Sequence, residues 1–224
     1  MTDICFDLVG FDLDGTLLDT GADLAAAVNH ALGLIDRPPL PIATIKPFIG
    51  RGAKLMLEKA LAVSGGVTPE LLEDLHPKLL DYYADHLCIE TAPYPGLIDA
   101  LDTLEARGIR LAVCTNKREA FARPLLDALG LTRRFSAIVG GDTLGPGFMK
   151  PKPDLVLEMI RQAGGGRTIF LGDTENDTNA ARAAGVPSIA VSFGFVACTA
   201  EELGADAGID HYDELVPLLE HWPA

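Results

Sequence analysis

The chain has 224 residues, 48% of them hydrophobic, and 32 acidic against 18 basic side chains give a formal net charge of −14. This size and composition supply a hydrophobic core for one large or two smaller globular domains. The negative charge disfavours nucleic acid as a partner, because phosphates require a basic face. The apolar runs are too short and interrupted to span a bilayer, and the first residues lack the pattern of a signal peptide, so we expect a cytoplasmic protein without a membrane partner.

The first expected strand leads directly into two aspartates. An apolar run that begins at Leu8 ends at Asp12 and Asp14, which Gly15 and Thr16 follow. Such a run predicts a buried strand of a parallel sheet, and these sheets bind ligands at the carboxyl ends of their strands. Two carboxylates this close raise each other's pKa in a partly dry site unless a cation lies near them. The alternative interpretation is an acidic turn without a chemical role.

Residues 20–90 have the periodicity of helices almost throughout. Prolines end the first expected helix, and Gly50-Arg51-Gly52 forms a flexible corner before the helix expected at 55–63. Thr68 is a capping residue, and Pro69 occupies the first position of the helix that follows. The expected helices cover about residues 21–34, 55–63 and 69–87, with a short helix or a turn at 44–49.

From residue 97 onward, helices and strands alternate at a spacing that predicts a doubly wound parallel sheet with right-handed crossovers, a Rossmann-like α/β core. The helical segment interrupts this core after its first strand. We therefore expect a core formed by residues 1–19 and 91–224, with residues 20–90 as an inserted helical domain. Strands are expected at 109–114, 137–139, 168–171 and 188–191. Helices are expected at 97–108, 119–129, 154–163 and 213–221, and one more helix, between the last two strands, is expected to end at residue 184.

Side chains that carry carboxylate, hydroxyl, amide or ammonium groups follow several of these strands or lie in the loops between them. Because the carboxyl ends of parallel strands meet at one edge of the sheet, we expect these side chains to converge. Four carboxylates around one point repel each other, which implies Mg²⁺, a hard ion that prefers oxygen ligands. A hydroxyl, an amide and a lysine are suited to hold phosphate oxygens. The residues concerned are Asp12, Asp14, Thr115, Asn116, Lys150, Asp173 and Asp177.

Four short motifs in this order resemble those of the haloacid dehalogenase-like superfamily, most of whose members are Mg-dependent phosphatases. Together they extend over most of the chain. Thr174 stands where such phosphatases often carry serine, and it keeps the hydroxyl. The motifs are Asp12-Leu13-Asp14-Gly15-Thr16, Thr115-Asn116, Lys150-Pro151-Lys152-Pro153 and Gly172-Asp173-Thr174-x-x-Asp177.

The resemblance implies a role for each motif residue. Asp12 would attack phosphorus and form an aspartyl-phosphate, Asp14 would be the acid and base, and Lys150 would neutralise the phosphoryl oxygens, with Lys152 a solvated neighbour. Asp177 is either a capping carboxylate of the next helix or a residue that binds the metal or orients its ligands. The implied ligands of Mg²⁺ are Asp12, Asp14 and Asp173, and the implied substrate-binding residues are Thr16, Thr115, Asn116 and Arg51.

The resemblance also implies a small phosphate ester as the partner. Residues 20–90 are similar to the family's small helical cap, which closes over the site and excludes water. The Phe-Ile-Gly-x-Gly corner at residues 48–52 and the later Tyr94-Pro95-Gly96 look most like phosphoglycolate phosphatases, so that Arg51 would meet the substrate carboxylate. An exposed arginine at a helix start is the alternative. Related hydrolases of sugar phosphates or pyrophosphate share the cap, and a sugar phosphomutase would use the same two aspartates.

Overall fold

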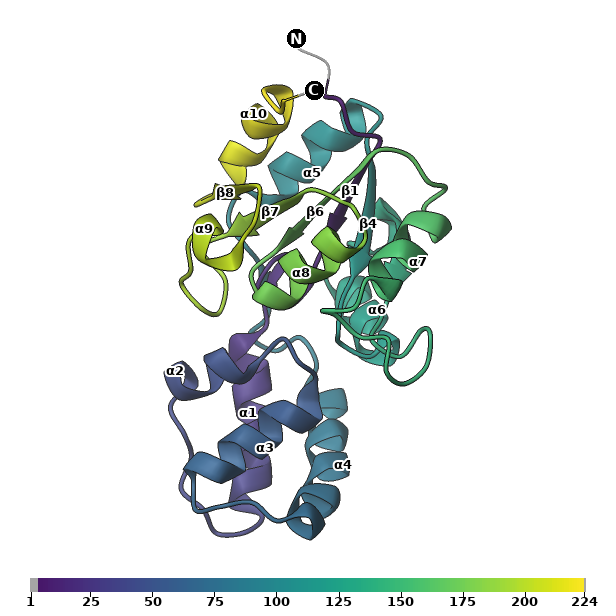
Figure 1. Ribbon diagram of the computed structural model, residues 1–224. Helices are drawn as coiled ribbons and strands as arrows, with labels where there is room; N and C mark the ends of the chain where they lie inside the picture. Colours follow the sequence, from purple (N-terminus) through teal and green to yellow (C-terminus); the bar gives the residue numbers. More distant parts are fainter. Residues whose placement is uncertain (1–3, 224) are drawn as a thin grey trace.

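The computed structural model describes residues 4–223 and confirms the predicted parallel α/β architecture (Figure 1). Within these residues the main sheet has six strands in the order β5-β4-β1-β6-β7-β8, and every neighbouring pair is parallel. The first strand of the chain therefore lies inside the sheet, where its carboxyl end is flanked on both sides. The strands are β1 (Leu8–Phe11), β4 (Arg110–Cys114), β5 (Phe135–Val139), β6 (Thr168–Gly172), β7 (Ser188–Val191) and β8 (Ala207–Ile209).

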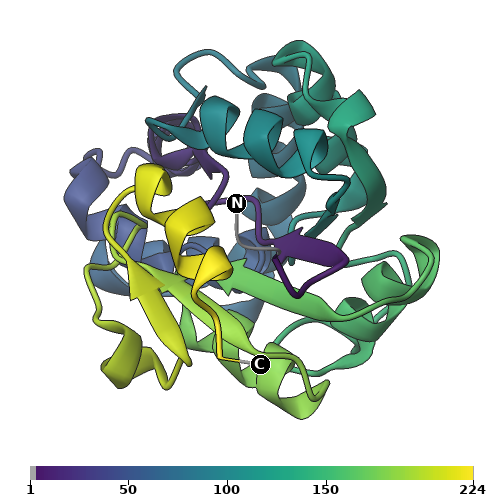
Figure 2. The ribbon, with the colours of Figure 1, turned by 90° about the horizontal axis from the view of Figure 1, so that it is seen from above.

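Helices cover both faces of this sheet, as the view from above shows (Figure 2). Side chains alternate along each strand, so that Val9 and Phe11 join the hydrophobic cluster on one face while Leu8 joins the cluster on the other. Buried residues of three helices complete the first cluster, and those of two helices complete the second. The first set is α5 (Leu97–Ala106), α6 (Glu119–Ala128) and α10 (Leu215–Glu220), and the second is α7 (Asp154–Gln162) and α8 (Glu175–Ala183).

Four further helices form a block beyond the carboxyl ends of the strands (Figure 1), which we call the cap. Its buried side chains form a hydrophobic cluster of their own, joined by Phe195 from a loop of the core. Thr68 caps the last of these helices by accepting a hydrogen bond from the backbone of Leu71 at 3.2 Å. The division at residues 19/20 and 90/91 stays a prediction. The helices are α1 (Gly21–Gly33), α2 (Ile42–Ile45), α3 (Ala53–Val63) and α4 (Pro69–Asp85), with the 3₁₀ turn η1 (Lys46–Phe48) after α2.

The sequence did not indicate the shortest elements. β2 (Leu18–Asp19) and β3 (Ala92–Pro93) pair antiparallel where the chain enters and leaves the cap. Two residues are too few to show a period, whereas the four-residue strands β1 and β7 were expected from their apolar runs. The helix expected at 213–221 begins instead with a 3₁₀ turn, η3 (Tyr212–Glu214). The other additions are η2 (Thr132–Arg134) and α9 (Ala200–Leu203), and β8 was also not expected. No helix within residues 4–223 is both long and apolar enough to cross a membrane.

Candidate active site

Three adjacent strands of the sheet, β4, β1 and β6, each deliver a polar residue at the edge that faces the cap. Thr115 follows β4, Asp12 follows β1 and Asp173 follows β6. Because the strands are parallel and neighbouring, residues 12 and 173 meet although they are 161 positions apart in the sequence. The order and register of the strands therefore bring these residues together at one edge of the sheet, which we call the floor of the site.

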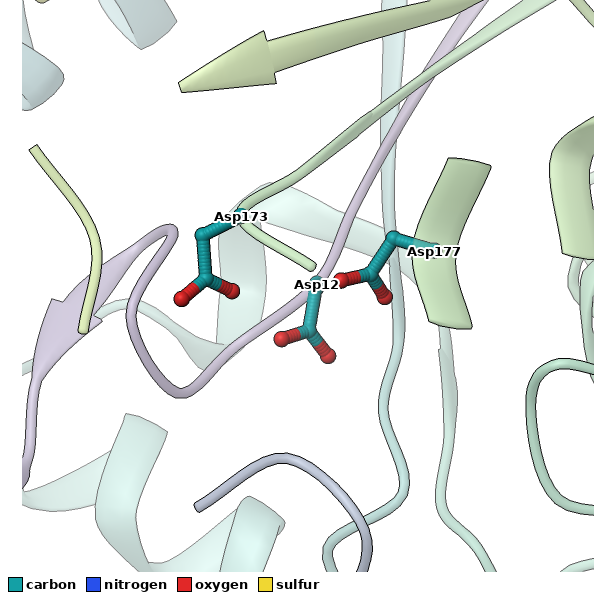
Figure 3. A group of neighbouring side chains, drawn as sticks. All are labelled: Asp12, Asp173 and Asp177. Atoms are coloured by element: carbon teal, nitrogen blue, oxygen red, sulfur yellow. The ribbon is translucent and has the colours of Figure 1, made fainter. Parts of the chain in front are cut away.

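The centre of this floor is a group of three carboxylates (Figure 3). Asp12, Asp173 and Asp177 each offer an oxygen, and these oxygens all lie within 4.8 Å of one another. All three residues are buried, with exposed fractions of 5%, 1% and 2%. An oxygen-only donor set of this density matches what a hard divalent cation requires.

Burial and mutual repulsion disfavour the ionised forms of Asp12 and Asp173. Burial raises the pKa of Asp12 to about 7, and repulsion from Asp177 adds to the effect while the ammonium of Lys150 opposes it. Burial, together with repulsion from Asp177 and Asp12, raises the pKa of Asp173 well above its ordinary range. Carboxylates that resist ionisation when alone become stable anions when a cation lies between them, so the site favours binding of positive charge.

Lys150 supplies one such charge from the loop that precedes α7. Its Nζ donates to Oδ1 of Asp12 at 2.7 Å, to Oδ1 of Asp177 at 2.6 Å and to the carbonyl of Cys114 at 2.8 Å. The side chain is 1% exposed, and its three acceptors account for the three protons of an ammonium. The two carboxylates raise the pKa of Lys150 despite its burial, which keeps it charged.

Asp177 is the capping carboxylate that was one of the two alternatives from the sequence, and a role in binding the metal or orienting its ligands stays a prediction. Its Oδ2 accepts hydrogen bonds from the backbone and the hydroxyl of Thr174, at 3.0 and 2.6 Å, and so closes a capping box at the start of α8. Its Oδ1 contacts Lys150 within the carboxylate group. The helix cap thus fixes a carboxylate that also shapes the charged centre.

Asp14 does not join the other carboxylates, where we had expected it. Its Oδ1 accepts from the hydroxyl of Thr20 at 2.6 Å and from Nζ of Lys117 at 2.7 Å, and Oδ2 lies 3.0 Å from the same Nζ. After β1 the chain turns sharply through Gly15, whose φ is +89°, and this turn separates the two aspartates. A role for Asp14 as a metal ligand stays a prediction.

The remaining polar residues of the first two motifs make contacts within the protein. The Thr16 hydroxyl donates to Oδ1 of Asp173 at 3.4 Å. Asn116 donates from Nδ2 to the carbonyls of Gly50 and Lys150, each at 3.0 Å, and its Oδ1 accepts from the backbone of Lys150 at 2.8 Å. Asn116 therefore links a cap loop to the lysine loop. Contacts of these residues with a substrate stay predictions.

Arg51 projects from the cap toward the core. Its guanidinium pairs with Glu175 at the start of α8, and both side chains are largely exposed. This contact crosses the gap between cap and core. An exposed ion pair is worth at most about 1 kcal/mol, so an anionic ligand can compete for the guanidinium.

A cavity of about 460 Å³ lies between the cap and the strand ends. Asp12, Asp14 and Thr115 lie at its floor, while Leu79 and Tyr83 belong to its largely apolar cap wall. The lining also contains four basic side chains and a histidine, together with the acidic side chain of Asp142. The basic side chains are Arg51, Lys54, Lys117 and Arg118, and the histidine is His76.

Lys117 and Tyr83 are among the cavity residues that had no role assigned from the sequence. Lys117 follows Thr115 and Asn116 at the end of β4, and this adjacency was the only available signal. Tyr83 occupies an apolar position of α4, and only its buried hydroxyl, which finds no hydrogen-bond partner among the described residues, distinguishes it from an ordinary core residue.

Comparison with known proteins identifies the family. The model of the family described as haloacid dehalogenase-like hydrolase matches residues 9–191. The chain is a haloacid dehalogenase-like hydrolase. The hydrolase is 43% identical to a phosphoglycolate phosphatase of Agrobacterium fabrum, over 93% of this chain and 90% of the relative. It is 41% identical to a phosphoglycolate phosphatase of Mesorhizobium japonicum, over 95% and 94% of the two chains.

A solved structure gives the same result for the fold of the hydrolase. The crystal structure of a predicted phosphoglycolate phosphatase from Haemophilus somnus superposes with a TM-score of 0.86 at 30% identity, and covers 95% of this chain and 97% of the other. The family expected from the four motifs is thereby confirmed.

Proposed function

We propose that this hydrolase is a Mg²⁺-dependent phosphatase that cleaves 2-phosphoglycolate through an aspartyl-phosphate on Asp12. The observation that carries the proposal is the buried contact of Asp12 with Lys150 inside the carboxylate group. The substrate rests on the two relatives named phosphoglycolate phosphatase, at 43% and 41% identity over most of their lengths.

The carboxylate group fits Mg²⁺ by its chemistry. Asp12, Asp173 and Asp177 provide oxygen donors at one point, and burial raises the pKa of Asp12 and of Asp173, which supports a cation as the missing partner of these carboxylates. Asp12 and Asp173 would hold the ion, with Asp177 beside them. When bound, Mg²⁺ neutralises charge on the carboxylates and on phosphate oxygens.

The first half of the reaction transfers the phosphoryl group to the enzyme. A carboxylate oxygen of Asp12 forms a bond to phosphorus in line with the ester oxygen, and the bond from phosphorus to that oxygen breaks. Lys150 offers its ammonium to the phosphoryl oxygens, because it already lies beside Oδ1 of Asp12. Protonated Asp14 gives its proton to the departing oxygen and leaves glycolate with a neutral hydroxyl.

The second half releases inorganic phosphate. Asp14, now a carboxylate, takes a proton from water as the water oxygen bonds to phosphorus, and the bond to Asp12 breaks. The apolar cap wall, with Leu79 and Tyr83, limits the access of other water to the intermediate. The products are glycolate and inorganic phosphate, and Asp12 returns to its free form.

Arg51 is the residue we assign to the substrate carboxylate. Arg51 is one of the residues that line the cavity, and its guanidinium pairs with an exposed carboxylate, Glu175. The carboxylate of phosphoglycolate replaces Glu175 in a contact with the same charge and hydrogen-bond geometry.

A screen of phosphate esters with Mg²⁺ tests this function. We expect phosphoglycolate to give a higher kcat/KM than glucose 6-phosphate, ribose 5-phosphate or pyrophosphate. In Arg51→Ala, kcat/KM for phosphoglycolate should fall by about 10- to 100-fold, because a hydrogen bond to a charged group contributes about 1.5–3 kcal/mol. Turnover of p-nitrophenyl phosphate, which has no carboxylate, should stay near that of the parent.

Arg133→Ala is the matched control, since Arg133 is exposed on a 3₁₀ turn of the core. If a sugar phosphate or pyrophosphate is the best substrate, the assignment to phosphoglycolate is wrong. If Arg51→Ala hydrolyses phosphoglycolate as well as the parent does, Arg51 does not bind the carboxylate. A phosphomutase would release little inorganic phosphate without an acceptor sugar.

A further inference from the structure

Lys117 makes the closest charged contact of Asp14. Its Nζ lies 2.7 Å from Oδ1 and 3.0 Å from Oδ2 of Asp14, so that one ammonium spans both carboxylate oxygens. The Lys117 side chain is only 5% exposed and that of Asp14 11%. A buried ion pair with this geometry fixes the direction of both side chains, because separating them leaves an uncompensated charge in a poorly solvated place.

The cap covers the other side of this ammonium. Nζ of Lys117 lies 4.8 Å from the ring centroid of Tyr83 on α4, within the range of a cation–π contact. The Tyr83 ring packs edge-on against Phe121 of α6, with centroids 5.5 Å apart and an interplanar angle of 67°. Lys117 therefore lies between a carboxylate of the core and an aromatic ring of the cap.

A second residue near the cap also holds Asp14. Thr20 precedes the first residue of α1, and its hydroxyl donates to Oδ1 of Asp14 at 2.6 Å. Both side chains that bind the Asp14 carboxylate thus touch the cap or belong to its entry. By contrast, Lys150, the other buried lysine of the site, binds Asp12 and makes no contact with Asp14 among the hydrogen bonds of the described residues.

We propose that Lys117 is a positioning residue that fixes Asp14 for proton transfer, and that the Tyr83 ring keeps Lys117 in place when the cap covers the site. The proposal rests on the function assigned to Asp14 above. Lys117 exchanges no proton and bonds to no reacting atom: Asp14 alone passes its proton to the ester oxygen and later accepts one from water. Cap closure and the placement of Asp14 are then linked through a single ammonium.

A double-mutant cycle separates this role from a merely structural one. If Lys117 acts through Asp14, Lys117→Met should lower kcat about 10- to 100-fold with KM changed less than about threefold. In the Asp14→Asn background the same substitution should cost less than about threefold, because the group it positions is already gone. Equal losses in both backgrounds would overturn the proposal.

Two further measurements exclude other roles for Lys117. The inhibition constant of inorganic phosphate should be the same for Lys117→Met and the parent. An increase of tenfold or more would mean that Lys117 binds phosphate directly, which contradicts the proposal. If Lys117→Met does not fold, as judged by its thermal transition, Lys117→Gln serves in its place, since it also removes the charge but keeps a polar end. Lys59→Met is the control, because Lys59 also lies over a ring, that of Phe48, at 5.8 Å and outside the site.

The contribution of Tyr83 is tested by two variants. Tyr83→Leu removes the ring and should lower kcat by several-fold in the parent but not in the Asp14→Asn background. Tyr83→Phe keeps the ring and should retain more activity than Tyr83→Leu. Equal losses in both variants would assign the effect to the hydroxyl and overturn the role of the ring.

The double-mutant cycles of Lys117 and of Tyr83 with Asp14 are measured with p-nitrophenyl phosphate as well as with phosphoglycolate as the substrate. A parent enzyme that ignores phosphoglycolate but hydrolyses the aryl ester would contradict the proposed substrate. The cycle on the aryl ester would still decide whether Lys117 acts through Asp14.

Discussion

At the scale of single residues, Asp12 combines burial with a cation at hydrogen-bond distance. The Lys150 ammonium holds Oδ1 of Asp12 at 2.7 Å, at the point where β1 ends and the cavity begins. Since an amide does not attack phosphorus, we expect Asp12→Asn to lower kcat by more than about a thousandfold. Asp127→Asn, at an exposed position of α6, is the control. A tenth of the parent activity in Asp12→Asn would exclude Asp12 as the nucleophile.

Lys150 permits a second prediction at this scale. Replacing it with Met leaves Asp12 and Asp177 without their shared cation, and breaking a buried pair in this way costs about 3–5 kcal/mol. Lys150→Met should therefore lower both kcat and the free energy of unfolding measured in urea without metal. Lys152→Met is the matched control, because that lysine is exposed two positions away. Parent-like stability and turnover in Lys150→Met would contradict the assignment.

The residue types of the site were predictable from the sequence, but the direction of each side chain was not. Asp12 and Asp173 meet because strand order and register bring them together, and parallel strands indicate this in advance. Asp14 lies only two positions from Asp12, yet the turn at Gly15 sends it to a different partner. That partner, Lys117, lies in the loop that follows another strand, β4, and no local pattern connects the two positions.

At the scale of secondary structure elements, one buried carboxylate fastens the two ends of the cap. Asp23, in the first turn of α1, accepts hydrogen bonds from the backbones of Ile89, Glu90 and Thr91 at 3.1, 2.9 and 3.1 Å. The Thr91 hydroxyl adds a fourth bond to Asp23 at 2.6 Å. The segment that leaves the cap is thus attached to the helix that begins it.

This attachment leads to a prediction about stability. In Asp23→Ala, three backbone amides lose their acceptor, and we expect the free energy of unfolding in urea to fall by about 2–4 kcal/mol. The amides of residues 89–91 should also exchange hydrogen faster than in the parent. Asp74→Ala, which removes an exposed pair with Lys78 on α4, should cost less than about 1 kcal/mol. Equal effects of the two substitutions would mean that the Asp23 contacts contribute little.

Long elements were more predictable than short ones for a physical reason. A helix such as α4 repeats its apolar positions over several turns, and Thr68 and Pro69 mark where it starts. β2 and β3 have two residues each, and only their mutual pairing makes them strands. Such pairing joins positions far apart in the chain, so the sequence around each one gives no sign of it.

At the scale of the whole molecule, charge is distributed unevenly. The chain carries −14 overall, yet its two deeply buried lysines, Lys117 and Lys150, lie at the strand ends that face the cap. The net charge repels anions, so an anionic substrate depends on local cationic groups such as Lys150 and Arg51 and on a cation that balances the carboxylates of the floor.

The buried carboxylates of the site make the free energy of unfolding depend on pH and on bound metal. Without metal, the folded protein keeps a proton on Asp12 up to about pH 7, whereas the ordinary value for this carboxyl is 3.8. Between these values the folded state binds more protons than the unfolded state, so the free energy of unfolding falls as pH rises. Mg²⁺ binds the ionised carboxylates, so the increase in Tm that it causes should be small near pH 5 and larger near pH 8.

Thermal unfolding with and without excess Mg²⁺ at the two pH values measures this dependence. Asp173→Asn should lose most of the increase at the higher pH, because it removes one of the proposed ligands. An increase in Tm that is the same at both pH values would contradict a link between Asp12 ionisation and metal binding.

The antiparallel pairing of β2 with β3 has a consequence for how this chain could diversify. Opposite residues in such a ribbon lie about 5 Å apart. The chain therefore passes from core to cap at Leu18–Asp19 and returns at Ala92–Pro93, and these two crossings lie side by side. Any insert whose ends are equally close could be spliced there without shifting the six-stranded sheet. Such an insert would also have to replace the cap contacts of the site, because the Tyr83 ring lies over Lys117 and the carbonyl of Gly50 accepts from Asn116.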